Sequence, residues 1–499
     1  MPTSPFDPTT SARVPAVGGC TIDEPVDVAV IGAGPAGLAA AVTLADAGCT
    51  IAVLDLADRV GGQYYRHAPE EMRAGKPGAY HHKWSVFVDL RDRFDAYVRS
   101  GRVAHLARHA VWSVDGTAVF TVRALEGERD RVGRTSYARA LIIATGAHDR
   151  HVPFPGWTLP GVMAVGGVQS LLKGNLVAAG RRVVVAGTGP FLLSAATGLL
   201  AAGVDVVAVA EANAPWQYLL YPRALAGAYS KLPEALGYGA RLVRRHVPYL
   251  LRHAVTRVHG TGRLNAVTIS RIDDRWRPVS GTERRLDCDT LAVGFGFTPQ
   301  LELLLALGCT PTVGVDGSLA ALVDEDQRTS ADGVFAAGES TGVGGADLAL
   351  VEGRLAGAAA ARHVGRRSPL GERETHRLRV QRRRLRRFAD AMHLVHPIHN
   401  GWTEWVDDTT LVCRCEEVSV SVIRGAVADL GAADPRTLKL LVRSGMGWCQ
   451  GRICGPAIAA LTAELAGRAV TQQDLESVAH RPLGQPVPLG VLAALCEEA

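Results

Sequence analysis

The fold is decided by residues 26–55, VDVAVIGAGPAGLAAAVTLADAGCTIAVLD. The apolar run at the start is typical of a buried strand, and the small residues after the glycines are typical of a closely packed helix. A second apolar run closes the segment at Asp55. The order of strand, glycine turn, helix and strand predicts a βαβ unit and therefore a parallel sheet.

Three glycines in this unit have the spacing that a pyrophosphate requires. Gly32 permits a tight turn, Gly34 lets the backbone approach the phosphates, and Gly37 lets the helix pack against the strand. The helix N-terminus adds positive potential, and Asp55 is placed to accept hydrogen bonds from ribose hydroxyls. The unit is therefore predicted to bind a dinucleotide through Gly32, Gly34, Pro35, Ala36, Gly37 and Asp55.

A second unit of the same kind begins at residue 182, where RVVVA leads into Gly187 and Gly189. The third glycine position holds Leu192, whose side chain should keep the helix away from the strand. Glu211 ends the next strand, where an acid favours an unphosphorylated ribose. Gly187, Gly189 and Glu211 are the candidate contacts, and three states of the site stay open: ATP, NAD or no nucleotide.

Two strand ends flank the second unit and indicate how the folds are connected. One strand runs into Ala144-Thr145-Gly146, and a later one runs into Ala337-Gly338-Glu339. The predicted fold class is α/β, with two Rossmann-like dinucleotide-binding domains, one inserted in the other, and a small C-terminal helical domain. The expected segments are an N-terminal tail (1–24), a first nucleotide domain (25–160 and 285–365), a second nucleotide domain (161–284), a helical linker (366–410), a cysteine-bearing domain (411–470) and a C-terminal tail (471–499).

Four of the nine cysteines form a C-x-C-x33-C-x4-C pattern, namely Cys413, Cys415, Cys449 and Cys454. Paired thiolates from separate turns suit an iron–sulfur cluster or a zinc ion, and the spacing alone leaves both open. Backbone N–H groups around Gly445, Gly447 and Gly451 could donate to cluster sulfurs. The other five cysteines have no paired spacing, so buried or incidental thiols are expected there.

Composition excludes several classes of protein. A chain of 499 residues with 47% apolar and 21% charged residues is globular, and its net charge of +5 is small. The basic run Arg382–Arg387 has no interleaved stacking aromatics, so a solvated or partner-facing helix surface is expected rather than a nucleic-acid site. No leader pattern and no run of about 18 apolar residues is found, which predicts a cytoplasmic protein without an integral membrane segment.

Four motifs in order carry a resemblance to a known family. They are IGAGPAG, then Gly61-Gly62-Gln63, then Ala144-Thr145-Gly146, and VFAAGE-x-TG-x-GGA at residues 334–346. This set resembles the two-dinucleotide-binding flavoproteins, which implies FAD in the first fold and places Gly338 and Glu339 at its ribityl and pyrophosphate region. That family more often has Asp at the position of Glu339. The disulfide reductases of this fold carry a cysteine pair that is missing here, so no thiol relay is expected.

The C-terminal run from VCRCEEV to GMGWCQGRICG resembles the BFD-like [2Fe–2S] domain, which implies that the four cysteines ligate one cluster. From about residue 25 onward, the chain is similar to the α (A) subunits of the opine oxidase, hydrogen cyanide synthase and D-hydroxyproline or L-proline dehydrogenase group. It is similar, less closely, to the α subunit of heterotetrameric sarcosine oxidase.

The resemblance implies a division of labour between subunits. A flavin-containing β subunit of the amino-acid-oxidase type oxidises a small-molecule amine, opine or imino acid, and this chain relays the electrons to an acceptor. The resemblance also allows two further components, an FMN at a subunit interface and a small γ subunit. No catalytic constellation is recognisable in this chain. Two other functions stay open: a self-sufficient NAD(P)H-dependent FAD/[2Fe–2S] reductase, and a scaffold that binds zinc.

Overall fold

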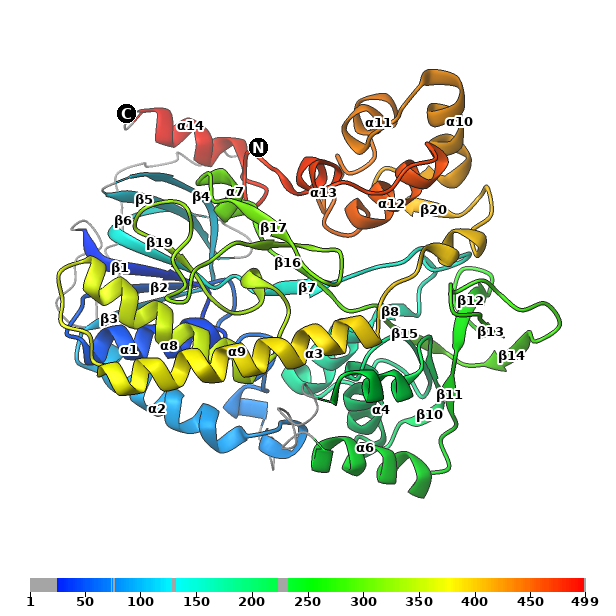
Figure 1. The fold of residues 1–499 in the computed structure, drawn as a ribbon, viewed down its shortest axis with the longest axis horizontal. Helices are drawn as coiled ribbons and strands as arrows, with labels where there is room; N and C mark the ends of the chain where they lie inside the picture. Colours follow the sequence, from blue (N-terminus) through cyan, green and yellow to red (C-terminus); the bar gives the residue numbers. More distant parts are fainter. Residues whose placement is uncertain are drawn as a thin grey trace, which may run out of the picture.

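The computed structural model describes residues 25–72, 74, 77–117, 119–127, 132–222 and 232–497. The expected N-terminal tail, with Cys20, lies outside these residues, as do the last two residues of the C-terminal tail. Two α/β lobes lie side by side, and a group of short helices sits above the second lobe (Figure 1). In the described part of the chain, no helix combines the length and apolarity needed to cross a membrane.

The first lobe is built on a seven-stranded sheet around β1 (Val26–Ile31). All six residues of β1 are buried, as expected for a strand covered on both faces. Parallel pairing joins β1 to β2 and β6, β2 to β3, and β6 to β19, while β4 and β5 are antiparallel. The other strands are β2 (Ile51–Asp55), β3 (Val103–Ala107), β4 (His109–Gly116), β5 (Phe120–Glu126), β6 (Val132–Ile143) and β19 (Val334–Ala336).

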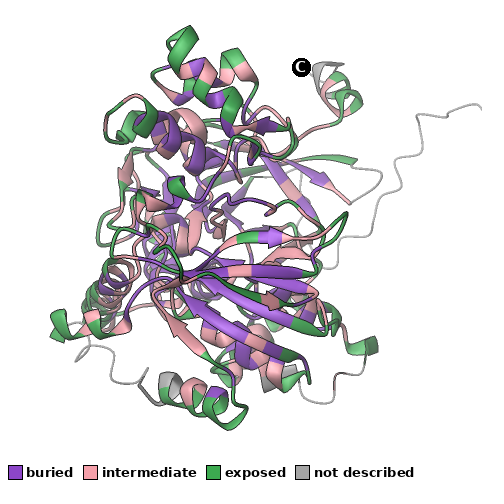
Figure 2. Cartoon of the chain, turned by 90° about the vertical axis from the view of Figure 1, so that its right-hand side faces the viewer, coloured by how far each residue is buried: buried purple, intermediate pink, exposed green. Residues whose placement is uncertain are grey.

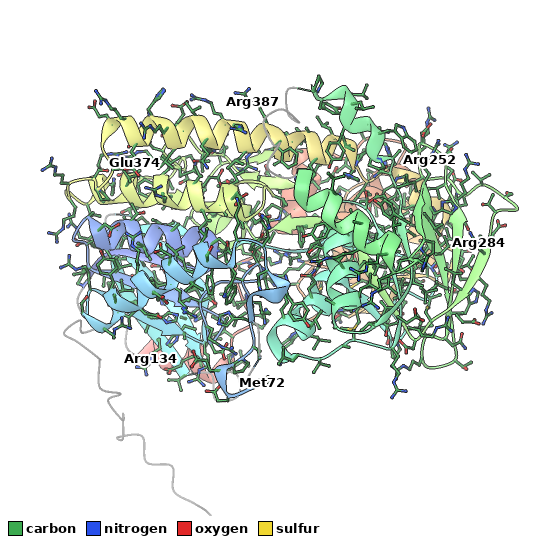
Figure 3. The ribbon with its side chains drawn as sticks, turned by 90° about the horizontal axis from the view of Figure 1, so that it is seen from below. Met72, Arg134, Arg252, Arg284, Glu374 and Arg387 are labelled. Carbon is green, nitrogen blue, oxygen red and sulfur yellow. The ribbon has the colours of Figure 1, made fainter. Side chains whose placement is uncertain are left out.

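Four helices lie next to one another in a layer beside this sheet: α2 (Trp84–Arg99), α1 (Pro35–Asp46), α8 (Ala346–His363) and α9 (Glu372–Val395) (Figure 3). Glycines let α1 and α8 approach closely. A Cβ on Gly353 would stand 2.1 Å from the carbonyl oxygen of Ala36, so a larger residue cannot fit there. The helix α9 continues past the first lobe to reach the second (Figure 1).

The second lobe contains a five-stranded parallel sheet in the order β11-β10-β9-β15-β8. It is inserted between β6 and β19 of the first sheet, and a two-stranded ribbon, β7 with β16, connects the lobes. The elements of this lobe and its ribbon are β7 (Ala147–Asp149), β8 (Val162–Ala164), α3 (Val165–Asn175), β9 (Arg182–Gly187), α4 (Phe191–Ala201), β10 (Asp205–Glu211), η3 (Pro215–Leu220), α6 (Leu232–Arg244), β11 (Tyr249–Leu251), β12 (His253–His259), β13 (Ala266–Arg271), β14 (Arg284–Asp287), β15 (Thr290–Gly294) and β16 (Phe297–Pro299).

Short elements complete the first lobe: η1 (Glu70–Met72), η2 (Pro77–Tyr80), α7 (Glu302–Ala306), β17 (Pro311–Val313), β18 (Leu319–Ala321) and η5 (Gly338–Thr341). After α9 come η6 (Asn400–Glu404), β20 (Leu411–Cys413), β21 (Val418–Ser419), α10 (Val420–Leu430), α11 (Pro435–Val442), α12 (Gly455–Leu465), α13 (Gln472–Ala479) and α14 (Leu489–Glu497).

The helices of the cysteine-bearing domain pack on the second lobe and share one buried core with it. Figure 2 shows the chain coloured by burial, with buried residues in purple. The core joins Trp276 and Leu291 of the second lobe to Ile423 and Leu438 of the helices. The indole N–H of Trp157 also donates to the carbonyl oxygen of Leu411 at 2.6 Å. The predicted fold class is confirmed: two Rossmann-like units, one inserted in the other, and a small helical C-terminal domain.

The expectation that the basic run Arg382–Arg387 is a solvated or partner-facing surface is wrong for two of its residues. Arg382 and Arg386 contact the carboxylate of Glu352 on α8 at 3.2 and 2.9 Å, and that carboxylate is 0% exposed. Arg387 on the same helix is exposed (Figure 3). One face of the run therefore fixes α9 to the first lobe, because a buried carboxylate must be paired.

Candidate functional site

The first glycine loop lies at the carboxyl end of β1, where open α/β sheets bind ligands. Gly32 has φ +104°, and a Cβ on it would stand 2.3 Å from the carbonyl oxygen of Ala144. A Cβ on Gly37 would stand 1.7 Å from the carbonyl oxygen of Gly32. Both positions therefore require glycine to keep the turn and the helix close to the strand.

Gly34 differs from these two, because the nearest described heavy atom to a Cβ added there is the Cα of Gly62, at 3.8 Å. The helix α1 that starts here has no side-chain cap and no acid in its first turn. Its backbone N–H groups therefore stay available for an anion. A shallow cradle bounded by glycines, at a helix N-terminus without a cap, fits the pyrophosphate of FAD.

Asp55 lies beside this cradle at the end of β2. Its two carboxylate oxygens accept from the backbone N–H groups of Ala33 at 2.5 Å and Ala57 at 2.7 Å. Burial raises the pKa of Asp55, and these two hydrogen bonds oppose the rise. The carboxylate is half-buried and keeps lone pairs that a ribose hydroxyl could use.

The Ala144-Thr145-Gly146 loop and Gly338 meet the cradle from the other strand ends. Ala144 N donates to Ile31 O at 2.8 Å, and the Thr145 hydroxyl donates to Gln300 O at 3.0 Å. Gly338 has φ +79°, and a Cβ on it would stand 2.9 Å from the Cβ of Ala36 in α1. The structure thus brings the glycine loop, Gly62, the ATG loop and Gly338 together, with Gln63 exposed at the margin.

The carboxylate of Glu339 is held by backbone N–H groups of the loop before α8. Its carboxylate accepts from the N–H groups of Gly345 at 2.8 Å and Gly344 at 3.4 Å, just before α8. Burial raises the pKa of Glu339, and these backbone donors counteract that effect. Its partner in shaping the loop is Glu352, which accepts from Gly338 N at 3.0 Å and was not found by sequence reasoning. The signal that could have revealed it is a charge inside the apolar run LALVEGRLAGAAAA.

The second glycine loop is closed by its own chain. The Glu211 carboxylate is 0% exposed and accepts from the Thr188 hydroxyl at 2.8 Å, Gly189 N at 2.8 Å and Asn213 N at 2.9 Å. His396, just after α9, adds an imidazole nitrogen at 3.4 Å. A ribose can reach Glu211 only if these partners move. Leu192 is buried, and a Cβ on Gly294 would stand 3.2 Å from its side chain, so it occupies the strand side of α4.

The four predicted cysteine ligands meet in two loops and at one helix end. Cys413 ends β20, Cys415 follows it, and Cys454 precedes α12, whose N-terminus favours negative charge. Cys413 and Cys454 are buried, Cys449 is half-buried and Cys415 is exposed. A Cβ on Gly447 would stand 2.3 Å from the Cβ of Cys415, so the two loops pack tightly against each other.

The thiols lie near enough to shift one another's pKa. A hydrogen bond from Cys454 lowers the pKa of Cys413 to about 6 and that of Cys449 to about 4, and it raises the pKa of Cys454. Backbone donors assist, since Gly445 N lies 3.5 Å from the sulfur of Cys413. Within the described residues, no group of three His, Cys, Asp or Glu side chains is already spaced as a metal site, and the four cysteines are free thiols that hydrogen-bond to one another. Four cysteine sulfurs, with hydrogen bonds that stabilise the thiolate form, fit the ligand set of an iron–sulfur cluster.

The loop from Cys449 to Cys454, here called the cysteine loop, contacts the connection between the lobes. The strand β7 starts directly after Gly146, and the His148 Nε2–H donates to the carbonyl oxygen of Arg452 at 3.0 Å. Arg452 lies between Cys449 and Cys454. Two residues of extended chain, about 7 Å, therefore separate the end of the ATG loop at Gly146 from His148, which is hydrogen-bonded to the cysteine loop.

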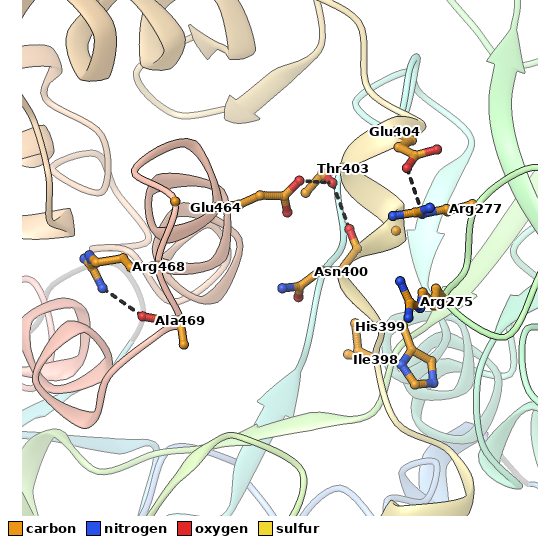
Figure 4. Close-up of a pocket in the computed structure, with 12 residues that line it drawn as sticks. Arg275, Arg277, Ile398, His399, Asn400, Thr403, Glu404, Glu464, Arg468 and Ala469 are labelled. Carbon is orange, nitrogen blue, oxygen red and sulfur yellow. Dashed lines mark hydrogen bonds and ion pairs between the residues drawn. The ribbon is translucent and has the colours of Figure 1, made fainter.

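An open cavity of about 760 Å³ lies elsewhere, between the loop after β13, η6 and the end of α12 (Figure 4). Its polar groups pair with one another: Thr403 donates to Glu464 at 2.7 Å, and Arg277 contacts Glu404 at 3.0 Å. None of the predicted site residues lines it. The cavity is therefore separate from both the glycine cradle and the cysteines.

Comparison with known proteins agrees with this geometry. Residues 26–365 match the pyridine nucleotide-disulphide oxidoreductase family, and residues 411–464 match the BFD-like [2Fe–2S] binding domain. The chain belongs to the pyridine nucleotide-disulphide oxidoreductase family. It is an FAD-type oxidoreductase with a [2Fe–2S] domain at its C-terminal end.

Relatives of this family match almost the whole chain. The HcnB subunit of hydrogen cyanide synthase from Pseudomonas aeruginosa is 32% identical over 94% of this chain and 99% of its own. The A subunit of opine oxidase from Rhizobium meliloti is 34% identical, again over 94% and 99%. A solved L-proline dehydrogenase from P. horikoshii has the same fold, with a TM-score of 0.67 at 20% identity over 94% of this chain and 79% of that one.

Proposed function

We propose that the chain is the electron-transfer subunit of a hetero-oligomeric amine dehydrogenase or oxidase. Its relatives are named as subunits of hydrogen cyanide synthase and opine oxidase, which supports a role inside a complex. The proposed partner is a flavin-containing β subunit of the amino-acid-oxidase type, and a further member of the complex is a small γ subunit. The partner oxidises an amine, opine or imino acid, and this chain passes the electrons to an acceptor.

The observation that carries the proposal is the hydrogen bond from His148 to Arg452 O, which joins the strand leaving the ATG loop to the cysteine loop. Bound FAD would supply two-electron chemistry and a [2Fe–2S] cluster would supply single-electron transfer. A relay needs these two sites to be adjacent and rigidly connected. The short ribbon β7–β16, paired from Ala147 to Asp149, meets that need.

We assign roles on the same basis. The residues proposed to hold FAD are Gly32, Gly34, Pro35, Ala36, Gly37, Asp55, Gly61, Gly62, Gln63, Ala144, Thr145, Gly146 and Gly338, with Glu339 acting through the turn before α8. The proposed cluster ligands are Cys413, Cys415, Cys449 and Cys454. An adenine nucleotide, ATP or NAD, at Gly187, Gly189 and Glu211 would bind without being consumed, and only after the hydrogen-bond partners of Glu211 move aside. An FMN would sit at the subunit interface.

Purification of the native complex without oxygen tests this function. We expect flavin, iron and acid-labile sulfide in this chain, a second flavoprotein that co-purifies with it, and reduction of the complex by at least one member of an amine, opine and imino-acid panel. A chain that is isolated alone, contains zinc instead of iron, and is reduced by none of the panel would contradict the proposal.

A further inference from the structure

Arg452 connects the cysteine loop to a buried acid of the first lobe. It lies between Cys449 and Cys454, and its Nε is 2.8 Å from an oxygen of Glu302 at the start of α7. Its guanidinium also donates to the carbonyl oxygens of Cys449 and Gly484. Glu302 is 6% exposed. The loop that carries two of the four cysteines is therefore held by a charge-assisted contact inside the protein.

A second arginine reaches the same carboxylate oxygen from the C-terminal segment. Arg481 is 8% exposed and lies 2.9 Å from Glu302. Its Nε donates to the carbonyl oxygen of Gln450, next to Cys449, at 2.5 Å. Its other nitrogens donate to the carbonyl oxygens of Ala479 and Val478. Arg481 thus holds the backbone of the cysteine loop at Gln450, in addition to the contact that Arg452 makes at Cys449.

The charges in this cluster do not cancel. Two guanidinium groups share one carboxylate, which leaves one net positive charge buried beside the cysteine loop. Burial lowers the pKa of Arg481, while Glu302 and the nearby Cys449 and Cys454 favour its charged form. Water screens a buried charge much less than an exposed one, so its field reaches the neighbouring sulfurs.

We propose that Arg452, Glu302 and Arg481, the arginine–glutamate triad, position the cysteine loop and set the reduction potential of the cluster that it holds. This inference rests on the proposed function of the four cysteines as an electron-carrying site. Uptake of one electron from a reduced flavin makes a [2Fe–2S] site more negative by one charge. A net positive charge beside it stabilises that reduced form and raises the potential, which makes the cluster a better acceptor.

The alternative is a triad that only anchors the domain. Two substitutions separate the possibilities, because they change the charge of the same contact in opposite directions. Glu302→Gln leaves the size nearly unchanged and raises the triad's net charge from one positive charge to two. Arg481→Gln lowers it to zero. A purely structural anchor would give both variants the same kind of defect.

The experiment is a potentiometric titration of the full chain, purified without oxygen, with the reduced cluster followed by electron paramagnetic resonance. We expect Glu302→Gln to shift the midpoint potential upward, Arg481→Gln to shift it downward, and Arg481→Lys to keep it near the wild-type value. The matched control is Arg468→Gln, which breaks an arginine–carboxylate contact with Asp474 of α13. Arg468 follows the C-terminal end of α12, and that end is about 16 Å along the helix from Cys454.

Iron and acid-labile sulfide per chain are measured for every variant. Equal shifts in one direction, or no shift at full iron content, would overturn the charge role. If Arg481→Gln loses iron, Arg452→Gln replaces it as the variant compared with Glu302→Gln. A midpoint potential of Glu302→Gln at or below the wild-type value would also overturn the charge role. A wild-type chain without any iron–sulfur signal would overturn the proposed function itself.

Discussion

Replacing Gly34 by alanine should weaken FAD binding while leaving the fold intact. The backbone at Gly34 has φ −72°, which any residue can adopt. Among the residues that the structure describes, the atom nearest to the new Cβ would be the Cα of Gly62, at 3.8 Å. Alanine is a poorer helix N-cap than glycine by about 1 kcal/mol, and it gains about 0.4–1 kcal/mol by restricting the unfolded chain. The free energy of unfolding of the cofactor-free protein should therefore change by less than about 1 kcal/mol.

The loss should appear in cofactor binding, because the methyl group stands where the pyrophosphate must approach backbone N–H groups. Losing one charge-assisted hydrogen bond costs about 1.5–3 kcal/mol, which is roughly 10- to 150-fold in affinity. The assay measures flavin per chain after purification and the dissociation constant on titrating FAD back. The control is Gly237→Ala on α6, where a Cβ would meet no atom of the described residues within 4 Å. Wild-type flavin content and affinity in Gly34→Ala would refute the assignment of the cradle.

Three further outcomes are expected. Glu352→Gln leaves Arg382 and Arg386 around an uncharged amide, and it should lower the free energy of unfolding, measured by urea titration, by about 3–5 kcal/mol. The control Glu325→Gln, at an exposed contact with Arg383, should lower it by under about 1 kcal/mol. Equal losses in the two variants would contradict the structure. Burial lowers the pKa of Lys173 from 10.5 to about 8, so between these pH values the unfolded chain binds one more proton than the folded chain. From pH 8 to 10.5, the free energy of unfolding of the wild type should therefore rise relative to that of Lys173→Met. Parallel plots of unfolding free energy against pH for the two proteins would disprove this. NADH should not rapidly bleach the flavin of the isolated chain, because Glu211 is enclosed by Thr188, Gly189 and Asn213; bleaching within the mixing time would show an open nucleotide site.

Local patterns predicted the architecture because each βαβ unit is encoded within about 30 neighbouring residues. The turn at Gly32 and the close helix approach at Gly37 could be predicted, because a Cβ at either position would clash with a backbone carbonyl oxygen and only glycine lacks a Cβ. The insertion of one lobe in the other was also predictable, since β6 and β19 carry recognisable strand ends on either side of the second unit.

Contacts between distant segments were beyond the same reasoning. Nothing around Glu211 indicates that His396, far along the chain, lies 3.4 Å from it. The basic run was expected to face solvent or a partner, and its contact with Glu352 was missed because that residue belongs to a different helix. Glu302 and Arg481 likewise become neighbours only when the C-terminal segment folds back over α7. Long-range pairing of charges depends on tertiary packing, which residue periodicity does not encode.

The most direct test of the account compares two half-reactions in the native complex after Cys415→Ser. Cys415 is the exposed member of the cysteine set, so its replacement should disturb the core less than a change at buried Cys413 or Cys454. In a single turnover with substrate, reduction of the partner flavin should proceed at the wild-type rate, while reduction of the external acceptor should fall at least tenfold together with the cluster signal. Equal loss of both half-reactions, or acceptor reduction at the wild-type rate without a cluster, would contradict a relay through this chain.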